Sequence, residues 1–303
     1  MNEFELIRRF FTRKTTVPVG IGDDCAIVDI PAGKQLCITT DTLTEGIHFT
    51  LKAEAKDIGY KTLAVNISDL ASCGAEPLYA TLALTLPAID ESWLADFSDG
   101  FFECADIFGV QLIGGDTTEG PLSMTVCAHG IVDTGKALLR SGARAGDLIF
   151  VTDTLGDAAL ALQGHLSDAH SLARLHRPFP QVEMGLALVN IASSCIDVSD
   201  GLLQDLGHIL QQSHKGAVIQ HIPLSEAART IDSALAIECA LTGGDDYVLC
   251  FTVAPEKIHA LPRGVLHIGY ITDTLGCYVV NEHGVAMLRE TKGFMHFTQL
   301  QIT

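Results

Sequence analysis

The sequence has no long hydrophobic run. Although 48% of its 303 residues are hydrophobic, no charge-free stretch approaches the roughly 20 residues that a membrane-spanning helix requires. Residues 1–11 mix acidic and apolar side chains and lack the apolar segment of a secretory signal peptide. We therefore expect a globular protein of the cytoplasm, with no membrane partner.

Basic residues are scarce. Lysine and arginine together number 19 against 37 aspartates and glutamates, which gives a net charge of −18. A chain this acidic repels nucleic acid and anionic membrane surfaces, so neither is expected as a partner. If the protein binds phosphates, metal ions must neutralise part of the charge.

Paired cysteines are lacking as well. The nine cysteines stand singly, without a Cys-x-x-Cys pair, which predicts reduced core residues and no disulfide framework. The twelve histidines show no His-Glu-x-x-His spacing, so a zinc site is not expected. No cysteine has an evident histidine partner, which argues against a cysteine nucleophile.

The common nucleotide-binding signatures are absent too. The sequence contains no Gly-x-x-x-x-Gly-Lys-Ser/Thr, no Gly-x-Gly-x-x-Gly between a strand and a helix, and no His-Arg-Asp with Asp-Phe-Gly. The P-loop, Rossmann and protein-kinase folds are therefore excluded. Any phosphate site must be of another kind.

The length and the polar segment 139–147 predict two domains. One hydrophobic core stops growing below 303 residues, and this glycine-containing segment leads into an apolar strand. We place the domains at 1–136 and 137–303.

Apolar spacing predicts the secondary structure of each domain. In the first, it predicts helices at 3–13, 57–73 and 91–108, and strands at 26–30, 35–40, 78–86, 110–113 and 122–132. In the second, it predicts strands at 148–151, 195–198, 217–220, 248–253 and 265–271, and helices from 155 and at 167–176, 181–193 and 201–212. Helices alternate with strands, so both domains are predicted to be α/β. In the first domain the helices should lie on one side of the sheet.

Aspartates next to glycine, threonine or serine recur along the chain. The stretches are Gly20-Ile-Gly-Asp-Asp, Thr39-Thr-Asp, Gly114-Gly-Asp-Thr-Thr, Asp197-Val-Ser-Asp-Gly and Gly243-Gly-Asp-Asp. Asp41 is expected at a strand end and Asp69 on the last turns of a helix. A single aspartate in such a place is usually a cap or turn residue. Several converging carboxylates need bound cations, however, and hard oxygen donors suit Mg²⁺. The pattern indicates a site for Mg²⁺ and phosphate.

A few other polar residues are candidates for this site. His48 follows a loop glycine, and Arg140 and Arg144 are among the few basic residues in glycine-containing loops. A guanidinium can clamp a phosphate by two parallel hydrogen bonds. The alternative is a solvated surface position for all three residues.

Eight ordered blocks resemble the thiamine-monophosphate kinase family. This family belongs to the superfamily of aminoimidazole ribonucleotide synthetase. The blocks are Gly20-Ile-Gly-Asp-Asp-Cys-Ala, Thr39-Thr-Asp-Thr-Leu, Gly46-Ile-His-Phe, Leu63-Ala-Val-Asn-Ile-Ser-Asp-Leu-Ala, Leu112-Ile-Gly-Gly-Asp-Thr-Thr, Arg140-Ser-Gly-Ala, Ile196-Asp-Val-Ser-Asp-Gly-Leu and Leu241-Thr-Gly-Gly-Asp-Asp-Tyr. They span nearly the whole chain, so the resemblance is far more specific than any single glycine motif.

The resemblance implies a fold, a reaction and a set of site residues. It implies an α+β protein of two aminoimidazole ribonucleotide synthetase-like domains, whose N-terminal sheets pair into a barrel in a homodimer. It implies transfer of a phosphoryl group from ATP to thiamine monophosphate with several Mg²⁺ ions. The family's metal ligands match Asp24, Thr39, Thr40, Asp41, Asp69, Asp116, Asp197 and Asp200. Its nucleotide contacts match Gly115, Asp116, Arg140 and Ser199, and its substrate contacts match His48, Asp245 and Phe294.

The implied reaction fits the composition of the site. The acceptor phosphate is already ionised at neutral pH, so no catalytic base is required. Metal ions, with Arg140 assisting, would neutralise the two anions and align them for an in-line transfer. A site rich in carboxylates and poor in bases is the expected result.

Two positions depart from the family pattern, and two other functions stay open. Asp245 stands where the family has a glutamate, so it could instead be only a turn residue, and Phe294 stands where the family often has Trp or Tyr. A related ATP-dependent synthetase is one alternative, although the functional cysteines of those relatives have no counterpart here. A non-catalytic metal-binding protein is the other, and it would not bind ATP.

Overall fold

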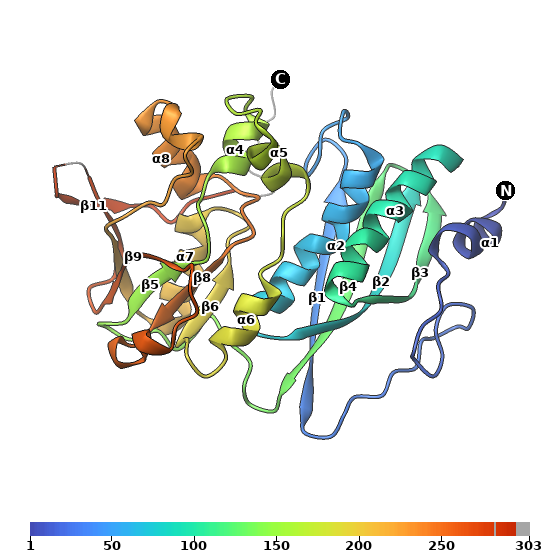
Figure 1. Cartoon of the computed structure of the whole chain (residues 1–303), viewed down its shortest axis with the longest axis horizontal. Coiled ribbons are helices and arrows are strands. Elements are labelled where there is room, and N and C mark those ends of the chain that lie inside the picture. The colour runs from blue at the N-terminus through green and yellow to red at the C-terminus, as the bar shows by residue number, and fades with distance from the viewer. Residues whose placement is uncertain (282, 295–303) are drawn as a thin grey trace. The chain divides into compact units, whose positions relative to one another are not determined.

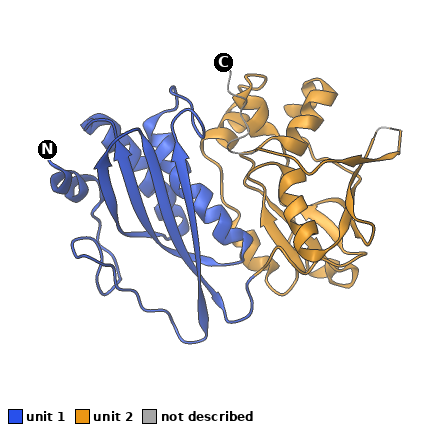
Figure 2. Ribbon diagram, turned by 180° about the vertical axis from the view of Figure 1, so that it is seen from behind, with its two compact units in different colours: residues 1–137 blue, residues 138–303 orange. Residues whose placement is uncertain are grey.

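The computed structural model describes residues 1–281 and 283–294. The chain divides into two units, Met1–Ala137 and Leu138–Thr303, which are coloured separately in Figure 2. Both mix helices and strands, which confirms the expected α+β class in its coarse form.

The first unit is a four-stranded sheet with two long helices on one face. The strands are β1 (Lys34–Thr44), β2 (Glu76–Leu86), β3 (Gln111–Glu119) and β4 (Ser123–Asp133), in the order β1-β4-β2-β3. Helices α2 (Ala55–Ser72) and α3 (Glu91–Phe108) cover one face (Figure 1). Seen from behind, the other face carries no helix (Figure 2). The predicted placement of the helices is confirmed.

Local sequence explains where α3 begins and ends. Asp90 caps it by accepting hydrogen bonds from the backbone N–H groups of Ser92 and Trp93, and Gly109 ends it in the left-handed conformation, with φ 70°. Helix α2 has no such caps and is held by packing: buried residues cover nearly all of its circumference. It packs against α3 beside it and against strands β1 and β4 beneath it.

Two glycines allow α2 and α3 to pack closely. A Cβ atom on Gly59 would lie 2.0 Å from the carbonyl oxygen of Phe97, and one on Gly100 would lie 1.7 Å from that of Lys56. No side chain fits at either place, so these positions require glycine.

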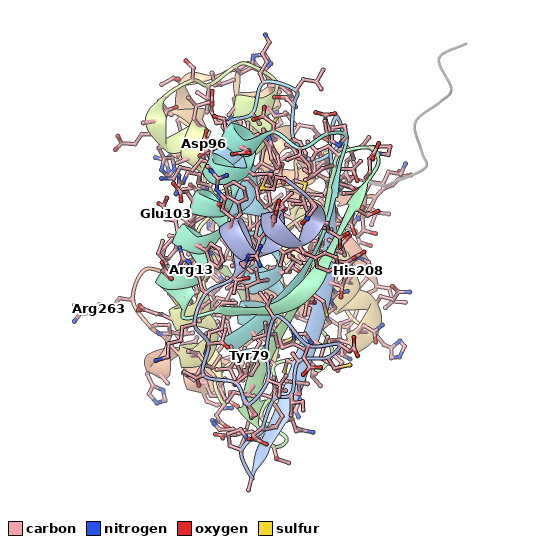
Figure 3. All side chains as sticks on the ribbon, turned by 90° about the vertical axis from the view of Figure 1, so that its right-hand side faces the viewer. Arg13, Tyr79, Asp96, Glu103, His208 and Arg263 are labelled. Carbon is pink, nitrogen blue, oxygen red and sulfur yellow. The ribbon has the colours of Figure 1, made fainter. Side chains whose placement is uncertain are left out.

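The N-terminal segment differs from its prediction. The expected helix at 3–13 is one α-turn, α1 (Glu3–Leu6), followed by a π-helical turn, Ile7–Phe11. Beyond it, the guanidinium of Arg13 lies 3.7 Å from the ring centroid of Phe102 and pairs with Asp106, which fastens the segment to α3 (Figure 3). The predicted strand at 26–30 is wrong. Only an isolated bridge between Val19 and Ile27 forms there, because no neighbouring strand pairs with this stretch.

The second unit is a seven-stranded mixed sheet with helices. Its strands are β5 (Leu148–Val151), β6 (Ser194–Asp197), β7 (Gly216–Ile219), β8 (Leu249–Val253), β9 (Leu266–Thr272), β10 (Gly276–Val280) and β11 (Ala286–Arg289), in the order β11-β10-β7-β9-β5-β8-β6. Its helices are α4 (Asp157–Leu162), α5 (Ala169–His176), α6 (Val182–Leu188), α7 (Leu202–Ser213) and α8 (Ser233–Thr242). The core includes Ile149, Leu202, Leu206 and Cys250.

Several elements of this unit were not predicted from the sequence. Helix α8 and strands β10 and β11 are additions, and α6 is shorter than the helix expected at 181–193. The nine cysteines are all free; five are buried and Cys25 is exposed. No helix among the described residues is long and apolar enough to cross a membrane.

Candidate functional site

Strand β1, at one edge of the first sheet, carries three of the predicted metal ligands. Thr39, Thr40 and Asp41 lie inside β1, which continues to Thr44, so the expectation that Asp41 ends a strand is wrong. Thr39 Oγ1 donates a short hydrogen bond to Asp69 Oδ2. The backbone N–H of Asp41 donates to the side chain of buried Asn66 at 3.1 Å. Helix α2 therefore supports this group of side chains from its last turns, where Asp69 was predicted.

His48 is held just beyond β1. Its Nδ1 accepts a hydrogen bond from the backbone N–H of Thr44 at 3.0 Å, and its carbonyl oxygen accepts one from Lys61 Nζ at 3.4 Å. With Nδ1 occupied as an acceptor, the neutral ring carries its proton on Nε2. The role of His48 as a substrate contact stays a prediction.

Strand β3, at the opposite edge, carries the glycine-rich nucleotide stretch. Gly115 has a φ of 149°, and a Cβ atom there would lie 1.9 Å from the carbonyl oxygen of Leu82. Only glycine therefore fits beside the irregular pairing of β2 with β3, where the register shifts between Ala80 and Thr81. Asp116 follows directly and is exposed.

A cavity of about 940 Å³ lies between β3 and the N-terminal segment. It brings together two of the predicted ligands, Asp24 and Asp116, which are far apart in sequence. It also has an apolar side. Its lining includes Phe4, Ile7, Arg8, Phe11, Gly22, Asp24, Leu82, Leu84, Gly115 and Asp116.

The sheet register separates the two groups of ligands. Asp41 pairs with Val126, Val126 with Leu82, and Leu82 with Gly115, so Asp41 and Gly115 occupy one row across the sheet. They stand at its opposite edges, and three strand spacings amount to about 14 Å. Accordingly, no three Asp, Glu, His or Cys side chains among the described residues are placed to hold a metal ion. The hard oxygen donors are of the right kind for Mg²⁺, but within the first unit Asp41 and Asp116 stand at opposite edges of the sheet.

In the second unit, the turn after β6 contains three predicted site residues. Asp197 is buried at the end of β6, and Ser199 and Asp200 form the turn that leads into α7. The backbone N–H groups of Ser199, Asp200 and Gly201 all donate to Asp205 Oδ2, at 3.0 to 3.1 Å. Burial raises the pKa of Asp205 to about 7, and these three hydrogen bonds oppose that shift. Asp205 thus fixes the shape of the turn.

Arg140 lies by the last turn of α7, where its carbonyl oxygen accepts from the Ser213 hydroxyl at 3.5 Å. Burial of His208 on α7 lowers the pKa of that imidazole, the charge of Arg140 lowers it further, and the carboxylate of Asp200 opposes both. The charges of Arg140 and Asp200 therefore both reach His208, which Figure 3 labels. Arg144 has a structural setting instead: its backbone N–H donates to Asp147, which helps to close the loop before β5.

Asp245 lies in a loop that is hydrogen-bonded to the same turn. Its N–H donates to the carbonyl oxygen of Ser199 at 2.9 Å, and the N–H of Tyr247 donates to that of Val198 at 2.7 Å. The Tyr247 hydroxyl donates to Asp245 Oδ1 at 3.1 Å. Both residues have positive φ, 67° for Asp245 and 48° for Tyr247.

The neighbouring Asp246 anchors this loop in the protein interior. Both of its carboxylate oxygens accept from the backbone N–H of Gly156 at 3.0 Å, and Arg174 Nη2 lies 3.7 Å from Oδ1. Burial raises the pKa of Asp246 to about 7, against the opposing charge of Arg174.

Phe294, the predicted aromatic contact of the tail, lies beside Asp200. Its N–H donates to the carbonyl oxygen of Asp200 at 2.9 Å, and its side chain is 41% exposed. The rest of the predicted aromatic tail cluster, 295–297, lies outside the described residues. The second unit therefore brings Ser199, Asp200, Asp245 and Phe294 to one place.

Four residues that support the Ser199–Gly201 turn and the Asp245 loop were not predicted from the sequence: Arg174, Gln204, Asp205 and Asp246. Asp205 had a signal, since an acid in the first turn of a helix after Ser-Asp-Gly is a typical cap. Arg174 and Asp246 could not be paired from sequence, because their contact depends on the packing of distant segments.

Comparison with known proteins gives consistent matches over the whole chain. Residues 22–132 match the family of AIR synthase related proteins, N-terminal domain. Thiamine-monophosphate kinase of Escherichia coli (strain K12) is 46% identical over 318 residues, covering 97% of this chain and 98% of its own. The enzyme of Bacillus subtilis (strain 168) is 34% identical over 329 residues, covering 98% and 100%.

Solved structures agree with these relatives. Thiamine-monophosphate kinase from Stenotrophomonas maltophilia superposes with a TM-score of 0.83 at 45% identity, covering 91% of this chain and 94% of its own. The structure described as AaThiL complexed with AMPPCP and TMP has a TM-score of 0.76 at 29% identity, covering 89% and 90%. Hydrogenase maturation protein HypE has a TM-score of 0.79 at 20% identity, covering 94% of this chain and 93% of its own, and shares the fold alone.

Proposed function

Since the chain belongs to the thiamine-monophosphate kinase family, we propose that it transfers the γ-phosphoryl group of ATP to thiamine monophosphate, giving thiamine diphosphate and ADP. The observation that carries this proposal is the 46% identity to the Escherichia coli kinase over nearly the full length of both chains. The related complex with AMPPCP, an ATP analogue, and TMP supports the pair of substrates.

We infer a direct in-line transfer. The acceptor phosphate is an anion at neutral pH, so the protein has no proton to remove and needs no catalytic base. The task left to the residues is to orient two anions and to offset their charge. Arg140 is the basic side chain that we assign to assist the transfer. His48, Asp245 and Phe294 would hold the thiamine monophosphate, and Gly115, Asp116 and Ser199 the nucleotide.

Mg²⁺ is the cofactor that the donor set fits. Asp24 with Asp116, and Thr39, Thr40 and Asp41 with Asp69, supply hard oxygen atoms in the first unit, and Asp197 and Asp200 supply them in the second. When bound, the ions offset charge on phosphate oxygens.

We propose that a homodimer completes this set. Strands β1 and β3 are long edge strands, and β1 exposes Leu36 and Ile38, at 38% and 61%. Open edges of this kind favour pairing with another chain. Two copies related by a two-fold axis could close their sheets into a barrel by pairing β1 of one with β3 of the other. That arrangement would bring Asp41 of one copy to Asp116 of the other.

One assay tests the function. The protein is incubated with ATP, Mg²⁺ and thiamine monophosphate, and both ADP and thiamine diphosphate are quantified, with and without excess chelator. Equal amounts of the two products, formed only without chelator, are expected. ADP without thiamine diphosphate would point to a related synthetase. If neither product forms, a separate titration with ATP is made, and a protein that does not bind ATP would be a metal-binding protein.

A mixed dimer tests the shared site. Asp41→Asn and Asp116→Asn are co-expressed with different tags, and the heterodimer is purified on both. If each site uses Asp41 of one copy and Asp116 of the other, the heterodimer has one site with both residues intact. It should then show roughly half of the wild-type activity, although each variant alone is nearly inactive. A heterodimer as inactive as its parents would refute the shared site.

The cytoplasmic location remains a prediction from the sequence.

A further inference from the structure

Residues 291–294 lie close against helix α7, and two glycines make room for this approach. A Cβ atom on Gly293 would lie 2.1 Å from the carbonyl oxygen of Asp200 and 2.9 Å from Cβ of Gln204. One on Gly207, a turn further along α7, would lie 2.8 Å from Cβ of Thr291. The segment therefore approaches the helix backbone closely from residue 291 to residue 294.

Gln204 joins this segment to the turn before α7. Its side-chain amide nitrogen donates to Asp200 Oδ2 at 2.8 Å and to the carbonyl oxygen of Phe294 at 3.0 Å. One nitrogen thus bridges the carboxylate of a predicted metal ligand and the backbone of a predicted substrate contact. The N–H of Phe294 donates back to the carbonyl oxygen of Asp200 at 2.9 Å.

We propose that Gln204 is a positioning residue for the thiamine monophosphate site. It holds the main chain of Phe294 beside the Ser199–Gly201 turn and so sets where this aromatic residue stands relative to the Asp245 loop. Gln204 itself does not touch the substrate. The proposal deepens the proposed function and rests on it for the identity of the ligand.

The chemistry of the bridge requires a side chain with two N–H donors. Both of its partners are oxygen acceptors, and a primary amide supplies two N–H donors on one nitrogen. Glutamate has the same shape and no donor in its ionised form, so Gln204→Glu turns two attractions into two repulsions. Gln204→Met keeps the length of the side chain and removes the donors without adding charge.

The experiment compares these variants with Gln211→Glu, which makes the same charge change at an exposed position of the same helix. Two quantities are measured: steady-state kinetics with each substrate, and hydrogen exchange at the Phe294 amide. Gln204→Met should raise KM for thiamine monophosphate about tenfold, with kcat and KM for ATP little changed, because the Phe294 segment is displaced without adding a charge beside Asp200. Exchange at Phe294 should accelerate about tenfold in this variant. Gln204→Glu should accelerate the exchange further and should also lower kcat, because its charge lies beside the assigned metal ligand Asp200, and Gln211→Glu should show neither effect.

The two measurements fail in distinguishable ways. Unchanged exchange at Phe294 in Gln204→Glu would overturn the bridge. Faster exchange with an unchanged KM for thiamine monophosphate would overturn its role in substrate binding. If the wild-type protein does not phosphorylate thiamine monophosphate, the proposed function is wrong and the substrate role fails with it, while exchange still decides whether Gln204 holds the segment.

Discussion

Asp245 offers the sharpest test of the substrate site, and asparagine is the substitution that the backbone demands. Asp245 has a φ of 67°, in the left-handed region that aspartate and asparagine tolerate. Alanine there would cost about 1–2 kcal/mol in backbone strain and would mix a stability effect with a binding effect. Asp245→Asn removes only the charge, and its side-chain oxygen can still accept from the Tyr247 hydroxyl, which lies 3.1 Å from Oδ1.

The expected magnitude follows from the hydrogen bond that the carboxylate would make to the thiamine part of the substrate. A charge-assisted hydrogen bond contributes about 1.5 to 3 kcal/mol. Its loss should raise KM for thiamine monophosphate roughly 10- to 150-fold. The contact lies away from the phosphates and is equally strong in the ground and transition states, so kcat and KM for ATP should change little.

Steady-state kinetics at varied thiamine monophosphate, together with thermal melting, decide between two interpretations of Asp245. Asp245→Glu restores the family residue and should keep activity, although glutamate tolerates the left-handed conformation less well and should lower the melting temperature. If Asp245→Asn leaves KM for thiamine monophosphate unchanged but lowers the melting temperature, Asp245 is a turn residue and the substrate contact lies elsewhere.

Three further predictions follow from the structure. Asp41→Asn and Asp116→Asn should each abolish most activity without unfolding the protein, as circular dichroism would verify; near-native turnover of both would remove them from the site. Gly59→Ala should lower the free energy of unfolding in urea by about 2 kcal/mol, because the methyl group meets the carbonyl oxygen of Phe97; an unchanged value would mean that α2 and α3 separate without cost. The raised pKa of Asp246, about 7 against an ordinary 3.8, means that the folded protein keeps a proton that the unfolded chain releases, so this group loses stabilisation as pH rises from about 4 to 7. Asp246→Asn does not titrate and should gain up to about 4 kcal/mol relative to wild type over that range in urea unfolding; a difference that is constant with pH would show Asp246 ionised throughout.

Elements with strong local signals could be predicted from the sequence. Helix α3 matches its predicted range, 91–108, because Asp90 and Gly109 mark its ends chemically. Strands β2 and β4 were found from their apolar alternation, since one face of each packs against α2 and α3. In these elements the signals, the helix caps or the alternation of apolar residues, lie within the element itself.

The missed elements carry weaker signals. Strand β10 is short and pairs in parallel with β7, which comes some 60 residues earlier, and its local partner, the antiparallel strand β11, is only four residues long. Helix α8 is apolar on most sides, and periodicity cannot identify a helix of that kind; its cap, Asp232, was the only local signal. The segment 26–30 has a strand-like sequence but forms no strand. Its Ile27 is 54% exposed and makes only an isolated bridge with Val19.

The family resemblance named the candidate site residues, but it did not show which of them lie close together in one chain. The sequence offers Asp41 and Asp116 as equivalent members of one cluster. The register places Asp41 in the same row as Gly115 but at the other edge of the sheet. The strand order decides this separation. Strand β2 lies between β4 and β3, so β1 and β3 are at opposite edges, and no local sequence pattern encodes that order.

The second unit organises its site through main-chain contacts at one turn. The carbonyl oxygens of Val198, Ser199 and Asp200 accept hydrogen bonds from Tyr247, Asp245 and Phe294 in that order. Each acceptor lies next to a side chain assigned to nucleotide or metal, and two of the donors carry side chains assigned to the substrate. Because backbone bonds of this kind have fixed lengths, displacing the turn displaces the loop and the tail with it. With the roles proposed above, this turn would set the distance from the transferred phosphoryl group to the thiamine part of the acceptor, and Asp205 fixes the turn by accepting from its three N–H groups.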